Sequence, residues 1–141
     1  MSDMTLSIEL RFLVYTALIC LLLWVPYIVA GIMTHGLPKM VGYGVSREEG
    51  VPEWAQRAYR AHLNLVENLA PFAVLVVVAH MLNVHSDLTV WGVQLFFWAR
   101  IVQIVVTWAG VPWVRTLAFA VGWVGNLLIF AALMGAGGGS A

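Results

Sequence analysis

The sequence predicts an all-α integral membrane protein, in the form of a bundle of four transmembrane helices. Three observations support this: 62% of the 141 residues are hydrophobic, only 10% are charged, and four apolar stretches are long enough to cross a bilayer. A soluble domain typically has about 25% charged residues, and a spanning helix needs about 20 mostly apolar residues. Residues 1–141 are therefore expected to form a single membrane domain.

The four helices are expected over residues 7–34, 53–83, 88–110 and 112–135. Residues 12–38 and 68–86 hold no formal charge, and residues 88–110 hold only Arg100. Pro26 is expected to kink the first helix, and Pro112 is placed to open the fourth, because proline favours the first helical position. The glycine-rich end of the chain, residues 136–141, is expected to be a flexible tail.

Basic residues set the expected orientation. Most of them lie in or beside the first and third connections, whereas the other side of the membrane has only Arg11. The basic residues on the richer side are Lys39, Arg47, Arg57, Arg60 and Arg115. The positive-inside rule therefore predicts that the first and third connections lie in the cytoplasm.

Composition excludes several classes of protein. Seven basic and seven acidic residues balance, so no surface for nucleic acid is expected. Cys20 is the only cysteine, which excludes an internal disulfide and a cysteine-rich zinc site. His62 and His80 would lie about 27 Å apart along one helix, so they cannot ligate one haem iron within a subunit, and no metal site is expected.

A polar stripe is expected along the start of the second helix. Arg57, Arg60, Asn64 and Glu67 are spaced by three, four and three residues, which places them on one helix face, and Asn68 lies at its edge. Arginine binds carboxylates, an amide both donates and accepts, and glutamate suits an amino group. The stripe therefore predicts a site for an anionic, zwitterionic or peptide-like ligand, open to the cytoplasm. The alternative is that the two arginines are interfacial anchors.

Arg100 is expected inside the hydrocarbon, because it would lie about 20 Å from the far side of the membrane when counted along the helix from Asp87. An unpaired charge there costs about 2.5–3.5 kcal/mol. Glu67 is the only acidic residue expected at a similar depth. We therefore expect an Arg100–Glu67 ion pair, which in the alternative interpretation is only a structural lock.

These residues carry a resemblance to a known family. The pattern R-x-x-R-A-x-x-N-x-x-E-N, from Arg57 to Asn68, is followed by Pro71-Phe72. It resembles the second helix of the MAPEG family, the membrane-associated proteins in eicosanoid and glutathione metabolism. A second stretch, Ala99-Arg100 and then residues 112–116, resembles the family's third helix and the start of its fourth. The agreement in length, spans and orientation extends along almost the whole chain.

The resemblance implies a homotrimer, of the bacterial type and in the inner membrane, that binds glutathione between subunits near the cytoplasmic face. Arg100 matches an arginine near that site. Arg57 lies on the same stripe as Arg60 and Asn64 and is expected to take part in cofactor binding with them. By position, Arg60, Asn64 and Glu67 match the family's glutathione contacts. Asn68, also expected in the cofactor site, matches a position that is a tyrosine in a well-studied member.

Arg115 matches the arginine thought to activate the glutathione thiol in this family. A free thiol has a pKa of about 8.5, and a fixed guanidinium nearby lowers it, so that the thiolate is available as a nucleophile. The resemblance thus implies a glutathione-dependent transferase or peroxidase that acts on lipophilic electrophiles. The alternative for Arg115 is an interfacial charge at the end of a helix.

Three positions depart from the polar groups of the well-studied enzymes: Gln103, Thr107 and Phe119. A second function class therefore stays open, a non-catalytic scaffold of the same fold that binds lipid or serves as an assembly subunit. A third class, a small proton-coupled exporter, places an acid inside the first helix. Here that helix has only Glu9, at its end.

Overall fold

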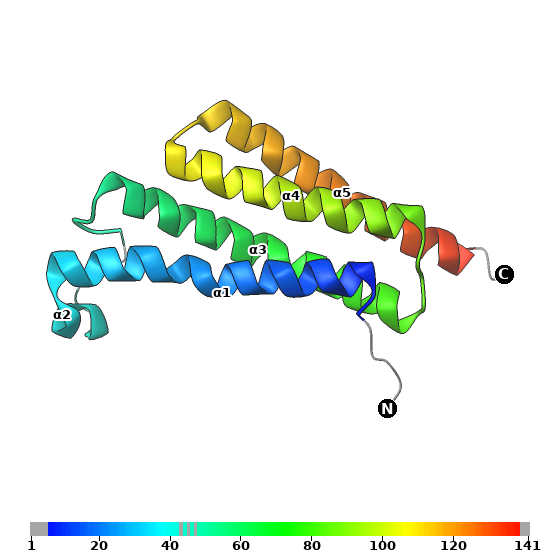
Figure 1. Ribbon diagram of the computed structural model, residues 1–141, viewed down its shortest axis with the longest axis horizontal. Helices are drawn as coiled ribbons and strands as arrows, with labels where there is room; N and C mark the ends of the chain where they lie inside the picture. The colour runs from blue at the N-terminus through cyan, green and yellow to red at the C-terminus, as the bar shows by residue number, and fades with distance from the viewer. Residues whose placement is uncertain (1–5, 43, 45, 47, 139–141) are drawn as a thin grey trace.

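The computed structural model describes residues 6–138 except 43, 45 and 47, and within them the chain is helical without strands. Four long helices lie side by side (Figure 1). The elements are α1 (Ile8–His35), α2 (Leu37–Val41), α3 (Glu53–Met81), α4 (Asp87–Ala109) and α5 (Pro112–Gly138). All of these except α2 are long and apolar enough to cross a membrane. The structure thus confirms the predicted all-helical architecture with four helices of spanning length.

The observed helix ends lie within two residues of most of the predicted ends. The exception is α5, whose helix continues to Gly138, three residues beyond the predicted end. No charge or proline interrupts this segment, and an uninterrupted helix satisfies its own backbone groups in an apolar medium. Residues 139–141 of the expected tail, and Arg47 in the first connection, lie outside the described residues.

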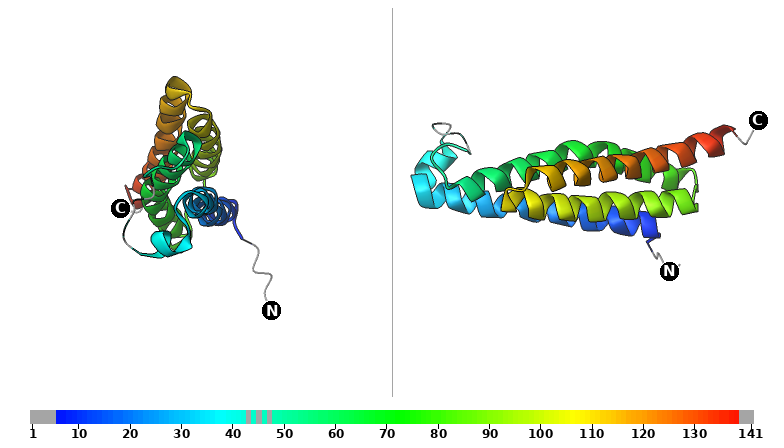
Figure 2. Two further views of the ribbon diagram at one scale, coloured as in Figure 1. Left: turned by 90° about the vertical axis from the view of Figure 1, so that its left-hand side faces the viewer. Right: turned by 90° about the horizontal axis from the view of Figure 1, so that it is seen from above.

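The bundle consists of two helix pairs that meet through α3 and through a direct contact between α1 and α4. The helices α4 and α5 form a tight hairpin, α1 packs along α3, and α3 also contacts both α4 and α5. The α4–α5 turn and the start of α3 lie at one end of the bundle, whereas the described chain ends and the α3–α4 turn lie at the other (Figures 1 and 2). This is the arrangement expected for four successive crossings.

Two glycines allow α4 and α5 to approach closely. A Cβ atom built on Gly125 would lie 2.7 Å from the carbonyl oxygen of Gly92 and 2.9 Å from the backbone nitrogen of Phe96. Small residues permit such backbone contact between membrane helices. Beside this crossing, the ring of Phe96 stacks on that of Phe72 from α3, with centroids 4.0 Å apart. The Phe96–Phe72 stack thus joins the hairpin to α3 beside this crossing.

A buried carboxylate joins three segments at the opposite end of the bundle. Glu9 is only 4% exposed, and its Oε1 accepts hydrogen bonds from Thr89 Oγ1 at 2.7 Å and from His85 Nδ1 at 3.3 Å. Thr89 also forms a reciprocal capping box with Ser86 at the start of α4. Glu9 therefore holds the start of α1 against the start of α4 and the preceding turn.

We expect Glu9→Ala to lower the free energy of unfolding by about 0.5–1.5 kcal/mol, because it removes the acceptor of the hydrogen bonds that join α1 to α4 and to the turn before it. The measurement is the thermal midpoint of the detergent-solubilised protein. Asp87→Asn is the control, since Asp87 is exposed nearby and forms no ion pair among the described residues. Equal midpoints for the two variants would contradict a structural role for Glu9.

Candidate functional site

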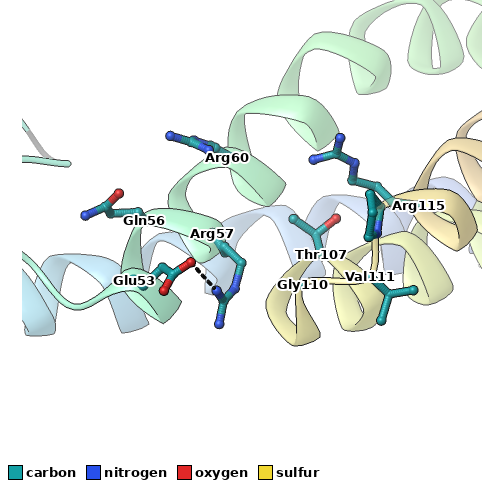
Figure 3. Close-up of a pocket in the computed structure, with 9 residues that line it drawn as sticks. Glu53, Gln56, Arg57, Arg60, Thr107, Gly110, Val111 and Arg115 are labelled. Carbon is teal, nitrogen blue, oxygen red and sulfur yellow. Dashed lines mark ion pairs between the residues drawn. The ribbon is translucent and has the colours of Figure 1, made fainter.

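Two adjoining pockets lie between α3 and the α4–α5 hairpin, at the end of the bundle that holds the α4–α5 turn. The outer pocket has a volume of about 260 Å³ (Figure 3). Its polar lining consists of Glu53, Gln56, Arg57, Arg60, Thr107 and Arg115. The second pocket, of about 250 Å³, is open on one side and is lined by Asn64, Gln103, Arg115, Thr116 and Phe119. It is called the deep pocket here because it lies about one helical turn further along the helices from the α4–α5 turn. Arg115 therefore lines both pockets.

The two arginines of the polar stripe each have an acidic partner from the same chain. Arg57 Nη1 lies 3.1 Å from Glu53 Oε1, one turn earlier on α3 (Figure 3), and its Nε donates to the carbonyl oxygen of Trp108 at 3.0 Å. Arg60 is more exposed, and its Nη2 lies 3.4 Å from Glu48 Oε2 in the segment before α3. Arg57 thus ties α3 to the end of α4, whereas Arg60 is held only by a surface contact.

Arg115 differs from these two arginines. It is exposed at the start of α5 and extends toward α3 (Figure 3). No acid lies within ion-pairing distance of it in the described part of the chain. Its guanidinium is therefore available to a negatively charged group in either pocket.

The remaining residues of the predicted stripe divide between the pocket and its surroundings. Asn64 lines the deep pocket, and Asn68 stands one turn behind it, with its Nδ2 donating to Asn64 Oδ1 at 2.8 Å. Glu67 is exposed and lines neither pocket. The structure therefore brings together Arg57, Arg60, Asn64 and Arg115, and leaves Glu67 on the outer surface of α3.

Arg100 is buried, with 2% of its surface exposed. Its Nη1 donates to Gln103 Oε1, and its Cζ lies 5.0 Å from the ring centroids of both Phe96 and Phe119. Within the described residues, no ion pair joins Arg100 to Glu67. The predicted pair is not formed inside one subunit, because Arg100 faces α5 and its own helix while Glu67 faces outward.

Several pocket residues were not among the predicted contacts. Gln103, Thr107 and Phe119 were noted only as departures from a family pattern, yet all three line the pockets. The hydroxyl of Thr107 is buried and has no hydrogen-bond partner in the described ranges. Glu53 also lines the outer pocket. The i,i+4 spacing of Glu53 and Arg57 in the sequence indicates their ion pair, because such residues meet on a helix surface.

Comparison with known proteins gives one positive result. A sequence model of the MAPEG family matches residues 12–135, a range that includes nearly all of the four long helices and every polar residue of the two pockets. No curated protein matches the chain significantly, and no solved structure does so either.

Proposed function

The chain belongs to the MAPEG family, and on this basis we propose that it binds glutathione across the outer and deep pockets and uses it as a transferase or peroxidase on lipophilic electrophiles. The observation that carries the proposal is the charge pattern of the outer pocket, where Arg57, Arg60 and Arg115 stand beside Glu53. Glutathione is a peptide with two carboxylates, one ammonium group and a thiol. Guanidinium groups suit its carboxylates, and a glutamate suits its ammonium group.

In this proposal each part of the site has a distinct task. Arg57 and Arg60 bind carboxylates in the outer pocket, and Asn64 binds a polar group in the deep pocket. Arg115, which reaches both, stabilises the negatively charged sulfur and so favours loss of the thiol proton. When bound, glutathione supplies the nucleophilic sulfur that attacks an electrophile dissolved in the membrane.

The assembly and orientation belong to the same proposal. We infer a homotrimer in which the exposed Glu67 reaches the glutathione of a neighbouring subunit. Four candidate spans make the chain a multi-pass membrane protein in contact with lipid. The pocket end is proposed to face the cytoplasm of a bacterium, because exposed basic residues such as Arg60 and Arg115 lie at that end.

We expect Arg60→Ala to weaken glutathione binding about 10–100-fold, because a hydrogen bond to a charged group contributes about 1.5–3 kcal/mol. The measurement is calorimetric titration of glutathione into the protein in mild detergent. Arg11→Ala is the matched control, since it removes an exposed arginine at the opposite end of the bundle. Unchanged affinity in Arg60→Ala would exclude Arg60 from the site.

A second candidate function is lipid binding by a non-catalytic scaffold of the same fold. It is favoured by a nearly apolar groove of about 310 Å³ on the α4–α5 hairpin, where Trp91 and Trp98 stand beside Leu95 and Val121. The absence of glutathione binding to the wild-type protein at millimolar concentration would favour this candidate.

A further inference from the structure

The amide of Gln103 has a fixed direction. Its Oε1 accepts a hydrogen bond from Arg100 Nη1. A guanidinium can only donate, so the atom that faces Arg100 must be the amide oxygen, and the NH₂ group must point the other way. Gln103 lines the deep pocket, and no acceptor from the described residues contacts its nitrogen. Arg100 thereby turns this NH₂ group toward the pocket.

The amide of Asn64 is fixed by an analogous chain of hydrogen bonds. Asn68 Nδ2 donates to the backbone oxygen of Asn64 at 2.7 Å and to its Oδ1 at 2.8 Å. A backbone carbonyl can only accept, so the Asn68 group at this position must be NH₂. The side-chain atom of Asn64 that it contacts must then be oxygen. The NH₂ group of Asn64 is therefore left for the deep pocket, which Asn64 lines.

Arg100 has little freedom to take another partner. It lies between the rings of Phe96 and Phe119, and a Cβ atom on Gly122 would lie only 3.2 Å from its Nη2. Its Nε and Nη2 atoms are buried without hydrogen-bond partners in the described part of the chain. An arginine buried at such a cost is a functional-site candidate. Here its one hydrogen bond is the one that orients Gln103.

The deep pocket is therefore rich in donors. Its lining residues carry two side-chain amides, whose oxygens are engaged elsewhere, and the guanidinium of Arg115, and no carboxylate from the described residues is among them. The hydroxyl proton of Thr116 is engaged with the carbonyl oxygen of Pro112, at 3.2 Å, and Phe119 adds an apolar wall. Oriented donors in such a setting stabilise negative charge without reorganisation.

We propose that the deep pocket is an anion site, whose donor character is set by two positioning residues, Arg100 and Asn68, that act through Gln103 and Asn64. The identity of the anion rests on the proposed function, under which it is the thiolate of glutathione. Gln103 then takes part in stabilising the sulfur together with Arg115. Arg100 is thus a positioning residue for the site, and Asn68 orients a contact residue without being one.

The test follows the side-chain amide of Gln103 by nuclear magnetic resonance with isotope-labelled glutamine. The chain has only two other glutamines, Gln56 and Gln94, and Gln103→Met assigns the signal. Three probes are titrated: glutathione, S-methylglutathione, which has no thiol, and thiocyanate, a simple anion. Arg100→Met removes the donor to Gln103, and Arg100→Lys keeps both a charge and a donor.

We expect glutathione and thiocyanate to shift the Gln103 signal in the wild-type protein, and S-methylglutathione to shift it far less. Arg100→Met is expected to abolish that shift and to weaken thiocyanate binding about tenfold or more, the effect of one lost hydrogen bond to a charged group. Arg100→Lys is expected to restore part of both. If Arg100→Met fails to fold, the Gln103 shift and the thiocyanate affinity are compared among wild type, Arg100→Lys and Asn68→Ala. Values equal to wild type in both variants overturn the inference.

The outcomes separate this inference from the proposed function. The inference is overturned if thiocyanate does not shift the Gln103 signal, or if it shifts that signal equally in wild type and Arg100→Met. This holds whether or not glutathione binds. A wild-type protein that binds thiocyanate through Gln103 but does not bind glutathione overturns the proposed function and supports the anion site.

Discussion

Replacing Arg115 by methionine is expected to lower the catalytic turnover of glutathione with a lipophilic electrophile about 10–100-fold, with a smaller loss of glutathione affinity. Arg115 lines both pockets and has no acidic partner in the described chain, so its charge is available to the sulfur. Loss of an interaction with a developing charge of about 1.5–3 kcal/mol gives a rate change of this size. The measurement compares turnover with calorimetric affinity.

Two companion variants sharpen this prediction. Arg115→Lys keeps a positive charge without the planar fork, and is expected to retain part of the turnover. Arg11→Met removes an exposed arginine at the far end of the bundle, and is expected to leave both quantities unchanged. Turnover equal to wild type in Arg115→Met would remove Arg115 from the chemistry while leaving the binding site intact.

The largest effect on stability is expected for Gly125→Ala. The added methyl group would lie 2.7 Å from one backbone atom of α4 and 2.9 Å from another, and backbone cannot move aside as a flexible side chain does. Overpacking of this kind typically costs about 1–3 kcal/mol. We expect a lower thermal midpoint in detergent, and weaker glutathione binding, because separation of the hairpin displaces Gln103 from Arg115.

Gly135→Ala is the matched control for that variant. It lies on the same helix, and a Cβ atom at this position meets nothing within 4 Å. It is therefore expected to keep the wild-type midpoint. A loss of stability that is equal in the two variants would mean that helix α5 responds to any added methyl group, and would remove the α4–α5 crossing as the cause.

The four long helices could be predicted from the sequence because a membrane span is recognised by the length of an apolar, nearly uncharged segment. Uncharged runs such as 12–38 and 68–86 leave few alternatives to a spanning helix. Most predicted helix ends therefore lie within two residues of the observed ends. The observed end of α5, at Gly138, lies three residues beyond the predicted one, because the poor helix propensity of glycine favours an earlier end in the sequence.

The candidate site was predicted only in part, because helical spacing gives depth and face along one helix but not the rotation of its neighbour. Arg57, Arg60 and Asn64 were placed on one face, and they line the pockets together with Arg115. Depth alone also suggested that Arg100 would meet Glu67. The direction of the Arg100 side chain depends on how α4 packs against α5. The residue spacing within each helix carries no information about that packing.

Two of the three arginines in the outer pocket, Arg57 and Arg60, already have internal counter-ions, so a ligand that binds them must exchange with these glutamates. An incoming carboxylate must displace Glu48 from Arg60 or Glu53 from Arg57, at a cost of at most about 1 kcal/mol for each exposed pair. A simple anion such as chloride leaves the displaced glutamate without a partner. A zwitterion offers that glutamate a new cation, so under the proposed function the outer pocket is expected to prefer a zwitterion over phosphates and inorganic anions.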